Sequence, residues 1–94
     1  MKVILRLAAR PDTVEALKPA LLELAAESRK EKDCLSYHVL QNQADPCDFT
    51  LVEEWTSEAA LDAHLKTQHV ATAFAKGGPL LASAPDARRY RTLG

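Results

Sequence analysis

The chain has 94 residues, with 12 lysines and arginines against 13 aspartates and glutamates and a formal net charge of -1. This length predicts one domain spanning residues 1–94, and such a small domain buries only about 60–65% of its unfolded surface, so that oligomerisation is a natural supplement to its stability. Both signs of charge are spread along the chain, which argues against a nucleic-acid-binding surface or a basic membrane-surface helix. No apolar run approaches the roughly 18 residues of a membrane span, and Arg6 interrupts the first apolar stretch, so we expect a cytoplasmic protein.

The first elements are predicted to be a strand and a helix. Residues 1–9 alternate between two faces, with Val3, Leu5 and Leu7 on one side, which is the period of a half-buried strand. A helix follows Pro11, and its inward face contains Val14, Leu17, Leu21, Leu24, Ala25 and Ser28.

The start of this helix is predicted at Asp12, because Asp12 and Glu15 have the spacing of a capping box. Pro19 then lies beyond the first turn, where a proline costs about 3 kcal/mol. We therefore expect a kink or a loose turn before Ala20.

A hairpin is predicted next. Leu35, Tyr37 and Val39 share one side of a strand, and residues 41–48, which contain an Asp-Pro pair, form the connection. One side of the following strand carries Phe49, Leu51, Glu53 and Trp55.

Two helical segments and a strand complete the pattern. Thr56 or Ser57 caps a helix whose inward face contains Ala60, Leu61, His64 and Leu65. Thr67 starts a short helix that passes through Val70 and Phe74 and stops at the glycines 77–78, and residues 87–93 form the last strand.

The order β-α-β-β-α-β predicts an α+β ferredoxin-like plait, a four-stranded antiparallel sheet with both helices on one face. The other face carries Ile4, Ala8, Leu40 and Val52 among polar residues, which is too apolar to be left in water. Two such sheets packed face to face would cover each other, so we expect a homodimer with two-fold symmetry.

Of the two cysteines, Cys34 opens the second predicted strand and Cys47 lies past its far end, in the turn. A strand of about ten residues spans about 33 Å, whereas a disulfide requires Cα atoms within about 7 Å. We therefore expect two free cysteines without a redox or zinc-binding role.

Candidate chemistry is concentrated between residues 49 and 74. Glu53 and Trp55 point the same way, and His64 from the helical layer would meet them in an apolar cleft. A buried glutamate needs a partner such as His64, His69 or Arg6, although Glu53 could equally serve only to satisfy a core histidine or a helix N-terminus. The spacing of His64 and His69 is no metal-binding motif, and we expect no metal.

Several segments together resemble the antibiotic biosynthesis monooxygenase family, particularly its small quinol-monooxygenase-like members with a dimeric α/β barrel. The resemblance covers nearly the whole chain and is carried by Cys34-Leu35-Ser36-Tyr37, Asp45-Pro46, Phe49-x-Leu51-x-Glu53-x-Trp55, Ala60-Leu61-x-x-His64 and His69.

The resemblance implies oxygenation of an electron-rich phenol or hydroquinone by O₂ without a cofactor. On this interpretation His64 is the base, Glu53 orients a histidine and His69 helps to position oxygens. The substrate would be bound by Tyr37, Trp55, Phe49 and Phe74. Two alternatives stay open, because the family also contains isomerases of small carbonyl compounds and members without known activity: an isomerase, or a non-catalytic dimer that binds a small ligand.

Overall fold

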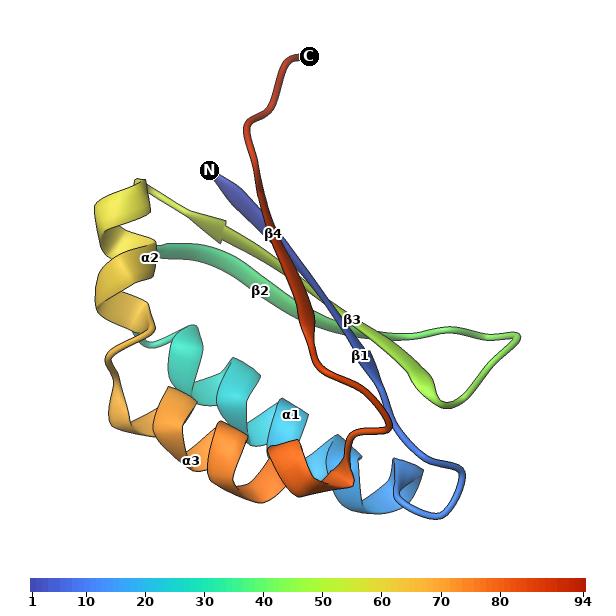
Figure 1. Cartoon of the computed structure of the whole chain (residues 1–94). Coiled ribbons are helices and arrows are strands. Elements are labelled where there is room, and N and C mark those ends of the chain that lie inside the picture. The colour runs from blue at the N-terminus through green and yellow to red at the C-terminus, as the bar shows by residue number, and fades with distance from the viewer.

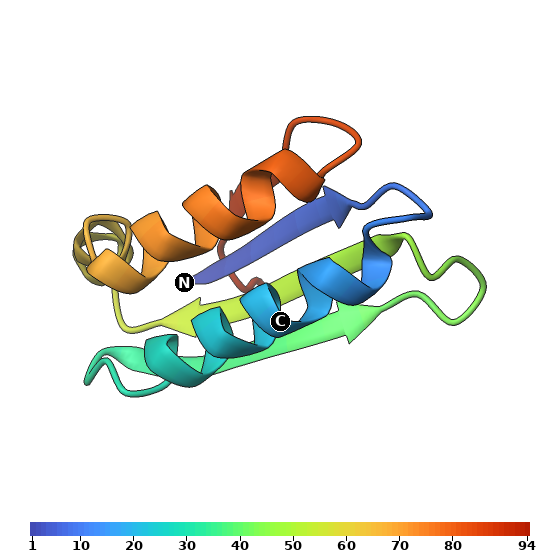
Figure 2. The ribbon, with the colours of Figure 1, turned by 90° about the horizontal axis from the view of Figure 1, so that it is seen from below.

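The computed structural model describes all 94 residues as one sheet covered on one face by helices (Figures 1 and 2). Its elements are β1 (Lys2–Ala8), α1 (Val14–Ser28), β2 (Cys34–Gln41), β3 (Asp48–Trp55), α2 (Glu58–His64), α3 (Gln68–Gly77), the 3₁₀ turn η1 (Gly78–Leu80) and β4 (Asp86–Tyr90). No helix has the length and apolar character that a membrane crossing requires.

The sheet has the strand order β2-β3-β1-β4, and every neighbouring pair is antiparallel. In Figure 2, α1 and α3 lie side by side over the sheet, and α2 lies at one end. This confirms the α+β ferredoxin-like plait, with the second helical region divided between α2 and α3.

The core forms between the helices and the sheet. The predicted inward face of α1 is buried, as are Phe49, Leu51, Glu53 and Trp55 of β3, which confirms both periodicities. The opposite sheet face leaves Leu40 50% exposed. The homodimer that would cover this face stays a prediction.

The side-chain caps predicted from the sequence are found at the starts of α2 and α3 but not at the start of α1. The Ser57 and Thr67 hydroxyls accept backbone N–H groups at the starts of α2 and α3, as predicted. The predicted cap at Asp12 is wrong, because α1 begins after Thr13, whose hydroxyl donates to the carbonyl of Leu80 at 2.7 Å. The helix also continues through Pro19.

Two apolar residues lie on the surface against expectation. A register shift between Cys34 and Ser36 inserts an extra residue in β2, so Leu35 turns outward and is 58% exposed instead of sharing the buried side with Tyr37. Leu65 follows the last turn of α2 and is 50% exposed. Cys34 and Cys47 are free, in agreement with their predicted separation.

Candidate active site

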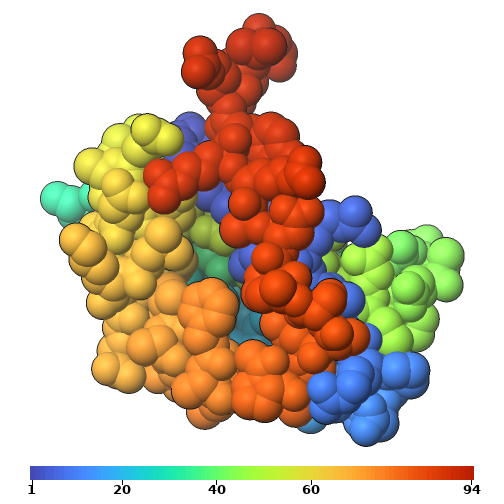
Figure 3. Space-filling view, viewed as in Figure 1, coloured from blue at the N-terminus to red at the C-terminus, as the bar shows by residue number.

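A cavity of about 380 Å³ lies between the helices and the sheet. Its wall is mostly apolar and is formed by β1, α1, β3, α3 and the segment that leads into β4, including Val3, Leu7, Leu17, Leu21, Leu51 and Val70. Figure 3 shows the surface hollowed between the orange atoms of α3 and the red atoms of β4. Phe74, which is 55% exposed, and Arg88 lie among the lining residues on these two elements.

Three buried polar side chains line this cavity: Tyr37 on β2, Glu53 on β3 and His64 at the end of α2. Their exposed fractions are 1%, 3% and 3%. Two further polar lining residues, Arg88 and Arg89, are exposed and pair with Asp86 and Asp62 instead. The buried polar chemistry of the cavity is therefore one phenol, one carboxyl and one imidazole.

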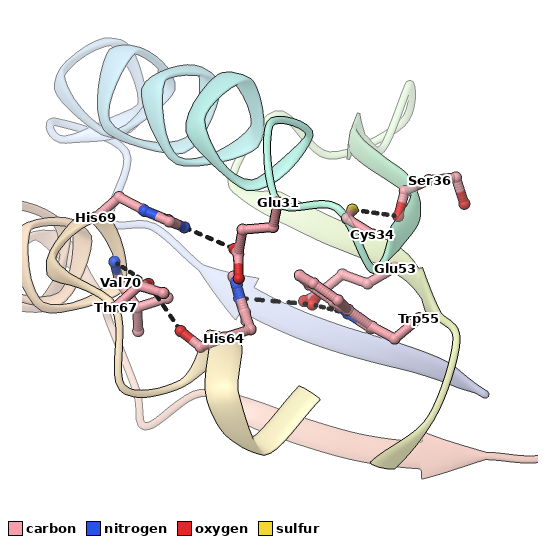
Figure 4. A network of polar contacts seen from close by, with 9 residues as sticks. All are labelled: Glu31, Cys34, Ser36, Glu53, Trp55, His64, Thr67, His69 and Val70. Atoms are coloured by element: carbon pink, nitrogen blue, oxygen red, sulfur yellow. Dashed lines mark hydrogen bonds and ion pairs between the residues drawn. The ribbon is translucent and has the colours of Figure 1, made fainter. Parts of the chain in front are cut away.

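Glu53 is held by the indole of Trp55, whose Nε1–H donates to Glu53 Oε1 at 3.0 Å (Figure 4). Burial raises the pKa of Glu53 to about 6, while the donors of Trp55 and Tyr37 act in the opposite direction. Arg6, one of the partners considered for this glutamate, instead lies on the surface near Asp48. Glu53 therefore occupies a site that favours its neutral form more than water does.

His64 lies between two carboxyl groups. Its Nδ1 is 2.6 Å from Glu31 Oε2, and its Nε2 is 3.9 Å from Glu53 Oε1. The imidazole packs on the indole of Trp55 with ring centroids 4.4 Å apart. Burial lowers the pKa of His64, opposed by the hydrogen bond and charge of Glu31, and the lowered pKa favours the neutral ring.

Tyr37 supplies a hydroxyl that stays protonated. Burial raises its pKa, and the neighbouring charge of Glu53 raises it further. The tyrosine can therefore donate a hydrogen bond to a cavity ligand throughout the neutral range.

Glu31 is a site residue that sequence reasoning missed. It lies in the turn between α1 and β2, where its N–H donates to Ser28 and its carbonyl accepts from Cys34, both at 3.1 Å. Its side-chain Oε2 contacts His64 and also His69 Nε2, the latter at 2.8 Å. The residue belongs to a run of charges, and no local pattern identified a partner 33 positions further along the chain.

The predicted site residues are only partly brought together. His69 does not line the main cavity; it lies on the α1–α3 side, in a second surface depression with Glu23 and Glu27. Phe49 and Trp55 are 2% and 1% exposed and are absent from the cavity wall, because they occupy the two ends of β3 while the cavity lies over its middle. Trp55 instead supports Glu53 and His64 from behind.

Glu31, His64 and His69 also have ligand atoms within 4.8 Å of one another, a set that could hold a metal ion. Two imidazole nitrogens already contact one carboxylate oxygen at hydrogen-bond distance. Hydrogen bonding alone accounts for this arrangement.

The model of the antibiotic biosynthesis monooxygenase family matches residues 1–76. The chain belongs to this family. A solved family structure, described as "Putative antibiotic biosynthesis monooxygenase from Nitrosomonas europaea", superposes with a TM-score of 0.95 at 26% identity and covers 100% of both chains.

Two relatives at low identity are named putative monooxygenases. "Putative monooxygenase Rv0793" of Mycobacterium tuberculosis is 35% identical over 79 residues, which are 84% of this chain and 77% of that protein. "Putative monooxygenase YcnE" of Bacillus subtilis is 29% identical over 80 residues, covering 85% and 84% of the two chains. The chain spans 56% of the length of an uncharacterised Synechocystis relative that is 28% identical over 82 residues.

Proposed function

We propose that this family member is a monooxygenase that oxidises a small electron-rich phenol or hydroquinone with O₂ and without a cofactor. The observation that carries the proposal is an apolar cavity of about 380 Å³ whose buried polar groups are Tyr37, Glu53 and His64. This volume falls within the range of about 300–1,000 Å³ found for small-molecule sites. The monooxygenase names of the relatives support the reaction class.

The chemistry begins with removal of a proton from the substrate hydroxyl by His64. A neutral buried imidazole is suited to this step, and an electron-rich phenolate can then supply electrons to O₂. Tyr37 and Glu53 hydrogen-bond the substrate oxygens, and the apolar wall excludes water from the reactive intermediate.

The overall reaction balances without an external reductant. One hydroquinone and one O₂ give one hydroxyquinone and one water: the substrate loses four electrons, one oxygen atom forms the new C–O bond, and the other leaves as water with two substrate hydrogens. Each O₂ consumed therefore corresponds to one substrate.

The supporting roles follow from position. Trp55 holds Glu53 and covers one face of His64, whereas Phe74 closes the side of the cavity formed by α3. The active form on this proposal is a homodimer, in which a second sheet covers the face that exposes Leu40.

Oxygen uptake with a panel of substituted hydroquinones in chelator-treated buffer tests the proposal. We expect uptake above the autoxidation rate, a ratio of one O₂ per substrate, and one atom of oxygen-18 from labelled O₂ in the product. Hydrogen peroxide in place of labelled product would indicate simple oxidation and contradict the proposal. Absence of uptake with every substrate would favour an isomerase or a binding protein.

A further inference from the structure

We infer that Glu31 is a positioning residue, which fixes His64 in the tautomer with the proton on Nδ1 and so leaves Nε2 as the base facing the cavity. This inference deepens the proposed function and rests on it for its catalytic part. The tautomer itself is a property of the resting protein and is testable without any substrate.

The contacts of Glu31 determine where the protons lie. A carboxylate only accepts hydrogen bonds, so both nitrogens in contact with Oε2 must carry hydrogen. The distances, 2.6 Å to His64 Nδ1 and 2.8 Å to His69 Nε2, are those of charge-assisted hydrogen bonds. Since a neutral imidazole has a single N–H, the Nε2 of His64 is left with a free lone pair.

This lone pair is directed to the proposed substrate site. Nε2 lies 3.9 Å from Glu53 Oε1, too far for a hydrogen bond, and both side chains line the cavity. Glu31 and His69 are not part of the cavity wall, so the ring presents one nitrogen to each side (Figure 4). A substrate hydroxyl can therefore give its proton to Nε2 while Nδ1–H stays bonded to Glu31, whose charge stabilises the resulting imidazolium.

The arrangement also assigns a different role to His69. Its side chain is 20% accessible and lies against the second depression, where it donates to the same oxygen of Glu31. Glu31 is thus held from three directions: by its backbone in the turn, by His64 and by His69. A carboxylate fixed in this way can impose one tautomer and one orientation on the catalytic ring.

Nuclear magnetic resonance of the ¹⁵N-labelled protein tests the tautomer directly. Long-range proton–nitrogen correlations at pH 8 should show His64 with a proton on Nδ1 and a bare Nε2, after the other rings are assigned with His38→Gln and His69→Gln variants. Glu31→Gln should move the proton wholly or partly to Nε2, because the new amide can donate to Nδ1. The same substitution at Glu15, which pairs with Lys18 on the surface and lines neither depression, should leave the spectrum of the histidine rings unchanged.

Kinetics test the consequence for catalysis. Glu31→Gln should lower kcat by on the order of 10²-fold or more with little change in KM, as for other carboxylates that orient a catalytic histidine. Because Glu31 raises the pKa of His64, its loss should also move the acidic limb of the kcat/KM profile to lower pH. The other titratable groups that face His64 are Glu53, His69 and Tyr37, and all three are retained in this variant.

The outcomes separate the two proposals. A wild-type ring protonated on Nε2, or an unchanged tautomer in Glu31→Gln, would overturn the role of Glu31, even if Glu31→Gln is less stable. The wild-type spectrum decides this point even where the variant fails to fold. Absence of oxygen uptake with an Nδ1–H ring would refute the oxygenase and leave the tautomer assignment standing.

Discussion

Replacing Glu53 by glutamine should raise the free energy of unfolding at alkaline pH, although it removes a carboxyl group from the candidate active site. The pKa of Glu53 is raised from its ordinary 4.5 to about 6, chiefly by burial. A group with a raised pKa in the folded state contributes stability that is fully present below the unfolded value and is lost as pH rises through the folded value. The ionised glutamate at pH 8 is therefore a cost that a neutral glutamine avoids.

The size of the effect follows from the shift. A change from 4.5 to about 6 corresponds to roughly 2 kcal/mol at pH 8, and integration of the same shift leaves only about 0.8 kcal/mol at pH 5. The glutamine amide oxygen can still accept the Nε1–H of Trp55, so the packing of the indole is retained. Glu53→Gln should accordingly exceed the wild type in free energy of unfolding by up to about 2 kcal/mol at pH 8 and by less than half as much at pH 5.

Urea denaturation at both pH values, at one fixed protein concentration, measures this difference. Glu54→Gln is the matched control, because the neighbouring residue points to the opposite face and makes a 3.7 Å surface pair with Lys2. Its effect should stay within about 0.5 kcal/mol at both pH values. A Glu53→Gln protein that is less stable than the wild type at pH 8 would show that the folded site favours the carboxylate. A gain that does not depend on pH would show that the pKa of Glu53 is not raised on folding, and either result would refute the reasoning.

Four further outcomes are expected. His64→Ala should lower turnover by about 10²–10⁴-fold while the variant remains folded by circular dichroism, and a fully active variant would remove His64 from the mechanism. Phe74→Ala should raise KM by about tenfold, the loss of roughly 1.4 kcal/mol of apolar contact, with little change in Tm because the ring is 55% exposed; a fall in kcat alone would contradict this role. Sedimentation at micromolar concentration should give twice the chain mass, and Leu40→Glu should weaken the dimer; a wild-type monomer would disprove it. Thiol titration of the denatured, unreduced protein should find Cys34 and Cys47 both reactive, and a loss of two thiols would reveal a disulfide.

The fold was predictable because its strands and helices have clear periods. The alternation of β3 identifies the buried face on which Leu51 and Glu53 lie, and the helical spacing of α2 places His64 on the same side. Strand period cannot, however, tell a residue in a cavity wall from one packed in the core. Phe49 and Trp55 share that buried face and still do not line the cavity, because the helical layer leaves space only over the middle of the strand.

Glu31 shows a different limit. It lies in a turn among charged residues, where a solvated side chain is the ordinary outcome, and only the tertiary fold brings it to two histidines. The position of Glu31 depends on the backbone hydrogen bonds of the turn and on where α2 ends. No short sequence pattern predicts either feature. Glu53 was considered as a partner of the imidazole and its Oε1 lies 3.9 Å from His64 Nε2, but the hydrogen bond to the ring is made by Glu31.

The two carboxyl groups around His64 differ in a way that gives proton transfer a direction. Glu53 borders the cavity, where burial favours its neutral form, whereas Glu31 lies on the far side of the ring with 21% of its side chain accessible. A positive charge that forms on the imidazole is therefore stabilised mainly from outside the cavity. The substrate proton moves to Nε2 on the cavity side of the ring, while Nδ1–H stays bonded to Glu31 on the far side. Because its pKa is raised, Glu53 also stays protonated to a higher pH than an ordinary glutamate, which lowers the negative charge beside the developing phenolate at pH values near or below 6.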